Sequence, residues 1–325
     1  MSELIAAPKF IELVANTPLI NLSSQLNSDN NNQLYAKCEF LNPGLSMKDR
    51  IVSYILNKAA DDGFLTIGNS VVCASSGNTG CSVAMMGAIL GYKVIIVTST
   101  KCSEEKQNHI RAFGARLDVV EEKHYMSHAK ELALEHGYFD INQYDNLDNP
   151  DAYYYSLAPE IWQQTQGKMT HFVMTASTFG CITGTSRYLK QQNPKIQTIL
   201  SDPENSKIDQ YFQAYHYDEP IQRENQPNYL IEGAGKSKPT RCTDFSLIDK
   251  VINVSDNEAV QCCHQASKTE GLLIGGSSGL NIAACQKLDG QVENAFIVTM
   301  LCDHGIKYLS KIYNPEFLKR QQIHV

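Results

Sequence analysis

The chain has 325 residues, of which 42% are hydrophobic and 9% aromatic, a balance that suits one large or two ordinary globular domains and excludes a disordered or fibrous protein. Its net charge of −7 comes from 35 acidic and 28 basic residues that form no basic block or stripe, so nucleic acid is not an expected partner. The apolar runs are far shorter than the roughly 20 residues that cross a bilayer, and the first ten residues lack the features of a secretory signal. We therefore expect a cytoplasmic protein that does not bind membranes.

Short apolar segments alternate with helical stretches in chain order. Strands are expected at 70–73, 92–98, 117–120, 171–174, 198–200 and 296–301, and helices at 81–90, 104–113, 127–136 and 183–190. This alternation indicates an α/β protein, in which a doubly wound, mostly parallel sheet is covered by helices. The asparagine-rich segment 27–32 is typical of a turn between two early strands, and the polar segment 205–238 is expected to be a long irregular surface segment.

Ten cysteines are scattered from Cys38 to Cys302 without a CxxC pair, which fits neither a zinc site nor a disulfide framework. We expect reduced thiols, mostly buried as small hydrophobic groups. The nine histidines show no HExxH or comparable spacing, so no metal is expected.

Open α/β sheets bind ligands in the loops after their strands, and the segment 42–50 is the first candidate. A Pro-Gly turn leads to Ser46 as the expected N-cap, with Asp49 three residues later in the manner of a capping box. Lys48 then lies in the first helical turn, where the positive helix end and neighbouring cations would lower its amine pKa and favour the neutral form that makes Schiff bases. The alternative is a surface lysine after an ordinary helix cap.

Two further loops, 75–80 and 175–181, each join an expected strand to an expected helix. Their hydroxyls, free backbone amides and helix N-termini would make cradles for a carboxylate or a phosphate. The alternative is a pair of well-capped turns that bind nothing. Neither segment is a GxGxxG or P-loop motif, so a dinucleotide or a nucleoside triphosphate is not indicated.

Several motifs, taken together and in this order, resemble the cysteine synthase and cystathionine β-synthase family, which uses pyridoxal phosphate. They are Asn16-Thr17-Pro18-Leu19, Lys37-Cys38-Glu39, Ser46-Met47-Lys48-Asp49-Arg50, the segment 75–80, the segment 110–115, the segment 143–161, Ile231-Glu232-Gly233, Gly275-Gly276-Ser277-Ser278-Gly279 and the segment 303–309. The resemblance implies the tryptophan-synthase-β-like fold of type II pyridoxal-phosphate enzymes. It also implies a small mobile α/β domain at 45–151, a large α/β domain made of 1–44 with 152–325, a cofactor in the cleft between them, and a homodimer.

The resemblance also assigns roles to individual residues. Lys48 would hold the cofactor as an internal aldimine and then remove the substrate Cα proton. Cofactor contacts would come from Asn78 at the phenolic oxygen, Ser177, Thr178, Phe179, Gly180 and Cys181 at the phosphate, and Ser277 at the pyridine nitrogen. Substrate contacts would come from Ser75, Ser76, Gly77, Thr79 and Gln143 at the α-carboxylate, with Gly233 and Lys238 near the second substrate.

A serine facing the ring nitrogen does not enforce its protonation, so elimination at Cβ competes well. The resemblance thus predicts β-replacement with ping-pong kinetics, in which an O-activated L-serine gives an aminoacrylate that a second nucleophile attacks.

Three departures from the family pattern concern the phosphate loop, the helical segment after Gln143 and the second substrate. Phe179 stands where a glycine is usual, Tyr153 where many relatives have histidine, and Lys236, Lys238 and Arg241 where sulfide-using members are largely apolar. The last change fits either an exposed loop or a larger anionic nucleophile, as in the N-(2-amino-2-carboxyethyl)-L-glutamate synthases of siderophore pathways, which these segments also resemble. Two other hypotheses remain: a catalytically silent relative, which Phe179 would suggest if its ring blocked the phosphate, and a serine or threonine dehydratase.

Overall fold

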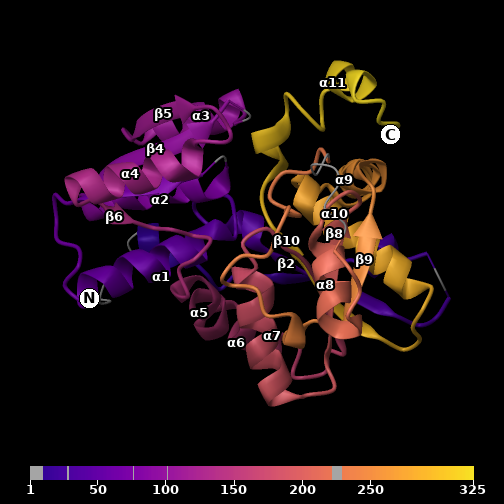
Figure 1. The fold of residues 1–325 in the computed structure, drawn as a ribbon. Helices are drawn as coiled ribbons and strands as arrows, with labels where there is room; N and C mark the ends of the chain where they lie inside the picture. The colour runs from indigo at the N-terminus through magenta and orange to yellow at the C-terminus, as the bar shows by residue number, and fades with distance from the viewer. Residues whose placement is uncertain (1–9, 28, 76, 101, 222–228) are drawn as a thin grey trace, which may run out of the picture.

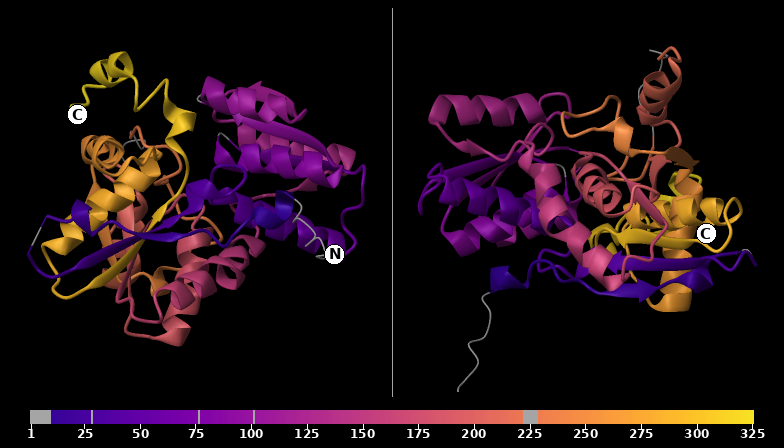
Figure 2. Two further views of the ribbon diagram at one scale, coloured as in Figure 1. Left: turned by 180° about the vertical axis from the view of Figure 1, so that it is seen from behind. Right: turned by 90° about the horizontal axis from the view of Figure 1, so that it is seen from below.

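A computed structural model describes residues 10–27, 29–75, 77–100, 102–221 and 229–325, and it contains two β-sheets, each with helices on both faces (Figure 1). The views from behind and from below show two lobes side by side, with the chain crossing between them (Figure 2). The expected α/β class with mostly parallel, doubly wound sheets is confirmed. No helix in the described part of the chain is long and apolar enough to cross a membrane.

The larger lobe is built on a six-stranded sheet. Its strands in spatial order are β1 (Leu19–Asn21), β2 (Gln33–Cys38), β10 (Phe296–Leu301), β7 (His171–Thr175), β8 (Gln197–Pro203) and β9 (Lys250–Val254). Only β1 runs antiparallel, and it pairs with β2 across the asparagine-rich segment, as expected for a turn between two early strands. Strand β10, the last strand in chain order, lies between β2 and β7 in the middle of this sheet.

The smaller lobe contains a four-stranded parallel sheet. Its strands in spatial order are β5 (Arg116–Val120), β4 (Lys93–Ser99), β3 (Ser70–Ala74) and β6 (Phe139–Asp140). Helix α2 packs on one face of this sheet and α4 on the other. Parallel strands buried on both faces need near-continuous apolar residues, and Val71, Val72, Ile95, Ile96 and Val97 supply them.

Eleven α-helices lie in the described part of the chain. They are α1 (Lys48–Asp61), α2 (Asn78–Leu90), α3 (Glu104–Ala112), α4 (Tyr125–His136), α5 (Asp148–Tyr155), α6 (Leu157–Gln164), α7 (Gly180–Gln192), α8 (Ile208–Tyr217), α9 (Asp256–Glu270), α10 (Gly276–Asp289) and α11 (Pro315–Arg320). Helix α10 contacts four strands of the larger sheet, with α9 outside it, while α5 packs on α7. The strands and helices expected from the sequence all exist, with boundaries that shift by a few residues.

The prediction of an irregular segment at 205–238 is wrong in its first part, because α8 occupies ten of these residues. Ile208 and Phe212, four residues apart, bury one helix face, while the remaining positions carry mainly polar and tyrosine side chains. Two apolar anchors give too weak a periodic signal in a short helix. Residues 222–228 of the same segment lie outside the described part of the chain.

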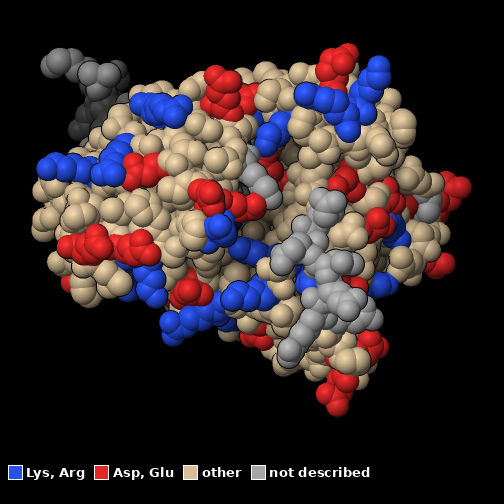
Figure 3. Space-filling model, turned by 45° about the horizontal axis from the view of Figure 1, so that its top comes forward, with Lys and Arg blue, Asp and Glu red and all other residues tan. Residues whose placement is uncertain are grey.

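Several expectations from composition can be compared with the structure. All ten cysteines are free and buried, as expected. Within the described ranges, no group of three or more His, Cys, Asp or Glu side chains could hold a metal ion. On the face drawn in Figure 3, basic and acidic side chains are interspersed, and a hollow near its centre is bordered by charges of both signs.

The contact between α5 and α7 gives a test of the fold. An added Cβ at Gly184 of α7 would overlap the backbone carbonyl oxygen of Pro150 in α5, which cannot move as a side chain can. We predict that Gly184→Ala lowers the free energy of unfolding by about 2 kcal/mol, the usual cost of overpacking. Gly290→Ala is the control, because no atom lies within 4 Å of its added Cβ. Equal denaturant midpoints for both variants would contradict the packing described here.

Candidate active site

Lys48 is the first residue of α1, so the prediction that it lies in the first helical turn is confirmed. The backbone N–H of Met47 donates to the carbonyl oxygen of Cys302 at 2.9 Å, which ties this helix start to the end of β10. The N-cap position is Met47 rather than Ser46, and the expected cap is therefore misplaced by one residue. The Ser46 hydroxyl still accepts a hydrogen bond from the backbone N–H of Lys48 at 3.3 Å.

Asp49 does not complete the capping box that its spacing suggests. Its Oδ2 accepts from the backbone N–H of Gly44 at 2.5 Å and its Oδ1 accepts from the hydroxyl of Ser82, in α2, at 2.5 Å. Gly44 is required here, because an added Cβ would overlap the Asp49 carboxylate. The carboxylate therefore joins the Pro-Gly turn and α2 to α1 instead of capping α1.

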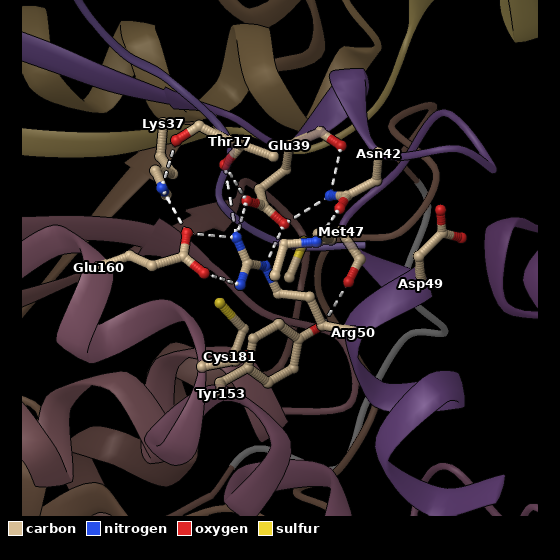
Figure 4. Close-up of polar contacts among 12 residues, drawn as sticks. Thr17, Lys37, Glu39, Asn42, Met47, Asp49, Arg50, Tyr153, Glu160 and Cys181 are labelled. Atoms are coloured by element: carbon tan, nitrogen blue, oxygen red, sulfur yellow. Dashed lines mark hydrogen bonds and ion pairs between the residues drawn. The ribbon is translucent and has the colours of Figure 1, made fainter. Parts of the chain in front are cut away.

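Arg50, two residues after Lys48, lies in a cluster of buried charges beneath the site (Figure 4). Its guanidinium contacts both carboxylate oxygens of Glu39 at 2.7 Å and those of Glu160 at 2.7 and 2.9 Å. Lys37 donates to Glu160 at 2.6 Å, and Thr17 donates to Glu39 at 2.6 Å. Burial alone would lower the pKa of Arg50, but the two carboxylates more than offset this effect and raise it. The cluster fixes the first turn of α1 against β2 and α6.

Tyr153 lies next to this cluster and is fully buried. Its hydroxyl donates to the carbonyl oxygen of Met47 at 3.3 Å. The tyrosine that replaces the more usual histidine therefore supports the backbone that presents Lys48.

A pocket lies at the start of α1, between the first residue of α2, the loop after β7 and the start of α10. The expected site residues that line it are Lys48, Asn78, Ser177, Thr178, Phe179, Cys181, Gly233 and Ser277. Residues from five separate segments of the chain, predicted as one site, thus surround one pocket.

The Lys48 amine has no hydrogen-bond or ion-pair partner among the described residues. Enclosure in the pocket lowers its pKa, while the nearby Asp303 carboxylate acts in the opposite direction. The expected direction of the shift is therefore found, but its cause is removal from water rather than the helix end and neighbouring cations. Cys181 and Cys302 line the same pocket. A lysine amine in these surroundings is available as a nucleophile and as a base.

The loop after β7 leads into the N-terminus of α7, as expected for an anion cradle. The first backbone N–H groups of a helix have no intrahelical acceptor. Because no side chain caps α7, these groups are available to an anion. Asn149 donates to the hydroxyl of Thr178 at 3.2 Å, and an added Cβ at Gly180 would overlap the Asn149 amide. A small residue at position 180 is therefore needed to keep the cradle in place.

Phe179 occupies a left-handed backbone conformation, with φ +65°, which explains why a glycine is usual at this position. Its ring is buried, and its centroid lies 6.1 Å from that of Phe245 in an edge-to-face arrangement. Phe245 in turn contacts Phe212 of α8. The backbone keeps the turn of a glycine while the ring packs into an aromatic cluster, which counts against a blocked phosphate site.

The expected carboxylate-binding residues lie at the start of α2 and beside it. The Ser75 hydroxyl accepts from the backbone N–H groups of Gly77 and Gly80 at 3.2 and 3.0 Å. The Thr79 hydroxyl donates to the side-chain oxygen of Gln143 at 2.7 Å, and Gln143 donates to the carbonyl oxygen of Ala74 at 3.0 Å. Four of the five expected residues thus belong to two hydrogen-bonded groups that are neighbours along the backbone, and Ser76 lies outside the described part of the chain.

Ser277 lies in the first turn of α10 and is buried beside the Cys302 thiol. The next residue, Ser278, accepts a hydrogen bond from the backbone N–H of Cys302 at 2.8 Å. Asn281, one turn later, accepts from the backbone N–H of Thr175 at 2.7 Å and donates to the carbonyl oxygen of Met300 at 3.0 Å. The start of α10 is therefore fixed to the ends of β7 and β10.

The three basic residues after Gly233 lie in two different environments. Lys238 and Arg241 are exposed, and neither is among the residues that line the pocket. Lys236 is half-buried, with its ammonium nitrogen 3.9 Å from the centroid of the Tyr144 ring, next to Gln143. Burial is the main cause of its lowered pKa, and no carboxylate forms an ion pair with it in the described structure.

Two groups of charged residues at the site have no role assigned from the sequence. Glu232, which lines the pocket, binds Lys106 of α3 at 2.6 Å and Lys311 at 2.5 Å. Asp303 and Lys307, which follow β10, both contact Asn78. Each of these residues lies in or beside a recognisable motif, but their partners are distant in the chain, so spacing alone could not pair them.

The arrangement fits a ligand that carries an aldehyde and a phosphate. An enclosed, unpaired amine can bind an aldehyde covalently, and the free N–H groups at the start of α7 can hold a phosphate. A buried hydroxyl at Ser277 and the amide of Asn78 complete the polar lining between these two points.

Comparisons with known proteins agree with this description. The family model for pyridoxal-phosphate dependent enzymes matches residues 11–303. Cysteine synthase B of Pseudomonas aeruginosa is 36% identical over 314 residues, which cover 95% of this chain and 98% of that protein. The solved structure of an O-ureido-L-serine synthase is similar with a TM-score of 0.87 and 26% identity, over 95% of this chain and 96% of the other. The O-acetylserine-dependent cystathionine β-synthase of Helicobacter pylori has a TM-score of 0.86 and 30% identity, over 96% of this chain and all of that chain.

The charge cluster under Lys48 gives a stability prediction. Glu39→Gln removes one of the two carboxylates around the buried Arg50. We expect a loss of about 3 kcal/mol in the free energy of unfolding, because an incompletely paired buried charge is costly. Lys58→Gln, which breaks the exposed ion pair with Asp62, should leave the melting temperature unchanged. The interpretation is wrong if chemical denaturation gives the same stability for both variants.

Proposed function

Because the chain belongs to the family of pyridoxal-phosphate dependent enzymes, we propose that it catalyses β-replacement on an L-serine whose hydroxyl carries an acetyl or phosphoryl group. The observation that carries this proposal is the enclosed, unpaired amine of Lys48 at a pocket that also contains the N-terminus of α7. The cofactor is pyridoxal phosphate, and the reaction is of the cysteine synthase type in amino-acid biosynthesis.

Four parts of the pocket would hold the cofactor. Lys48 would bind it covalently through Nζ, the N–H groups at the start of α7 together with Thr178 would hold its phosphate, Ser277 would face its ring nitrogen, and Asn78 would face its phenolic oxygen. When bound, pyridoxal phosphate withdraws electrons from the substrate Cα and makes the Cα proton acidic.

The protein's own groups would then position and deprotonate the substrate. Ser75, Gly77, Thr79 and Gln143, with Ser76, would hold the α-carboxylate so that the Cα proton faces Lys48. The Lys48 amine, whose pKa is lowered by enclosure, would accept that proton at Nζ. Departure of the acetate or phosphate from Cβ would follow, and a second nucleophile would take its place.

We propose that residues 45–151 form a small domain that closes over the large domain made of 1–44 and 152–325. The bridge from Lys106 through Glu232 to Lys311 supports this assignment, because it links α3 of the four-stranded lobe to two segments of the other lobe. Closure over the α-carboxylate would exclude water and protect the reactive Cβ position from hydrolysis.

We also propose a homodimer that works in the cytoplasm. Ten buried, unpaired cysteines are typical of proteins in a reducing compartment. Exposed apolar side chains at Phe10, Leu13 and Leu41 offer contact area for a second copy.

The second nucleophile is not yet identified, and one observation favours an acceptor that carries a carboxylate. The half-buried Lys236 ammonium lies on Tyr144, beside the carboxylate-binding group, without an ion-pair partner in the described structure. Sulfide needs no such cation, whereas a carboxylate-bearing amine, thiol or hydroxylic acceptor would pair with it. The neighbours named O-ureido-L-serine synthase and cystathionine β-synthase indicate that this fold serves acceptors other than sulfide. An acceptor such as glutamate, giving N-(2-amino-2-carboxyethyl)-L-glutamate, is the second candidate function, with Lys238 as a further contact.

Two rival functions can be distinguished from β-replacement by observation. A silent relative would need Phe179 to block the phosphate, but this ring packs against Phe245. A serine or threonine dehydratase would release a keto acid steadily from serine without any acceptor, which a product assay detects.

The covalent role of Lys48 gives the first test. Purified protein with added pyridoxal phosphate should show visible absorption, and borohydride reduction followed by peptide mapping should find the pyridoxyl group on Lys48. Lys48→Ala should lose both signals while remaining folded, and Lys168→Ala, at an exposed lysine, should keep them. An adduct on another residue, or none, would refute the assignment.

The second test identifies the acceptor. O-acetylserine and O-phosphoserine are each offered with sulfide, homocysteine, cysteine and glutamate, and products are identified by mass. If the acceptor is anionic, we expect Lys236→Met to raise its KM about tenfold, the scale of one charge-assisted hydrogen bond, and to leave the KM for the serine substrate unchanged. Lys168→Met is the matched control for loss of charge at the surface, because Lys168 is exposed and does not line the pocket. Turnover with sulfide but with none of the three amino-acid acceptors would eliminate the candidate in which the acceptor carries a carboxylate.

A further inference from the structure

The side-chain amide of Asn78 lies between two buried charged residues that come from the far end of the chain. Its Nδ2 donates to Oδ2 of Asp303 at 2.7 Å, and its Oδ1 accepts from Nζ of Lys307 at 2.9 Å. Asp303 follows β10 and is fully buried, and Lys307, in the short helical turn Gly305–Tyr308, is 3% exposed. Asn78 itself opens α2 and lines the same pocket as Lys48.

These two partners fix which way the amide points. A lysine amine at this position donates to the oxygen, and a carboxylate accepts from the nitrogen, so the oxygen and nitrogen of Asn78 cannot exchange places without losing both hydrogen bonds. The Nδ2 group has two hydrogens, and Asp303 takes one of them. The Tyr308 hydroxyl, which also hydrogen-bonds Asp303 and Asn78, lies on the same side as Asp303. The second hydrogen is therefore the donor that Asn78 can offer to the pocket, while its oxygen is directed toward Lys307.

Asp303 and Lys307 are themselves held firmly. The Tyr308 hydroxyl donates to Oδ2 of Asp303 at 2.5 Å, and an added Cβ at Gly275 would overlap Oδ1 of the same carboxylate. Lys307 donates a second hydrogen bond, at 2.8 Å, to the carbonyl oxygen of Gly44 in the loop that precedes Lys48. The same lysine thus connects the Asn78 amide to the loop that presents the reactive amine.

We propose that Asp303 and Lys307 are positioning residues that lock Asn78 as a hydrogen-bond donor toward an anionic oxygen in the pocket. This inference rests on the proposed function, in which that oxygen is the phenolic oxygen of pyridoxal phosphate. A freely rotating amide would present its own oxygen part of the time and would repel the phenolic oxygen. The pair therefore acts on cofactor binding through Asn78 and not by touching the cofactor.

The test measures the dissociation constant of pyridoxal phosphate and the visible absorption band of the bound cofactor in Lys307→Met and Asp303→Asn. We expect Lys307→Met to bind the cofactor about tenfold more weakly and to show an altered band, because a hydrogen bond to an anionic oxygen is weakened. Lys307→Arg, which keeps a donor, should recover most of the affinity. Asp303→Asn keeps the shape of the site, and it replaces Lys307→Met in the measurement if Lys307→Met does not fold.

Lys190→Met is the matched control, because Lys190 also donates to one backbone carbonyl and one side-chain oxygen, those of Ile196 and Asp249, but does not line the pocket. It should lose stability while keeping cofactor affinity and absorption. The decisive comparison is a double-mutant cycle with Asn78→Ala, in which Lys307→Met should cause no further loss of affinity.

The positioning role is wrong if the losses of cofactor affinity from Lys307→Met and Asn78→Ala add up in the double variant. It is also wrong if Lys307→Met leaves both the absorption band and the cofactor affinity unchanged. Wild-type protein that forms no visible band with pyridoxal phosphate would instead overturn the proposed function, and this inference with it.

Discussion

The burial of Arg50 between Glu39 and Glu160 is the constraint on which the site depends. The Lys48 amine has no partner of its own among the described residues, so its position comes entirely from the backbone that carries it. That backbone is fixed from below by Arg50 and from the side by Asp49, which binds Gly44 and Ser82. A reactive amine can thus stay unpaired, with a pKa lowered by enclosure, because neighbouring residues hold the backbone that carries it.

The two sheets supply different parts of one site. The loop after β3 and the start of α2 come from the four-stranded sheet, while the starts of α7 and α10 follow or cover strands of the six-stranded sheet. Helix N-termini carry unsatisfied N–H groups and a partial positive charge, so a pocket surrounded by several of them favours anionic groups without needing a dense cluster of lysines. A chain with a net charge of −7 can therefore still offer sites that suit anionic groups.

The features that could be predicted from the sequence are those with a local signal. Lys48 after a Pro-Gly turn, the hydroxyl-rich loops at 75–80 and 175–181, and the alternation of strands and helices all depend on neighbours in the chain. The Asn78–Asp303 and Lys106–Glu232 contacts could not be found in this way, because 225 and 126 residues separate the partners. Ser46 was misplaced as the N-cap because Asp49, which should reach back to it, binds Gly44 instead. Tertiary structure therefore decides which of two possible partners Asp49 binds.

The bridge through Glu232 shows how charge is distributed around the substrate side of the pocket. Burial would raise the pKa of Glu232, but Lys106 and Lys311 together lower it, so this carboxyl stays ionised. The Lys106 ammonium also lies 4.3 Å from the centroid of the Tyr308 ring and near Gly77, so a cation lies beside the loop expected to hold a carboxylate. A cation there would strengthen anion binding most when the two lobes are close, because enclosure reduces screening by water. In the proposed closure of residues 45–151, substrate binding and closure would then favour each other through the same three charges.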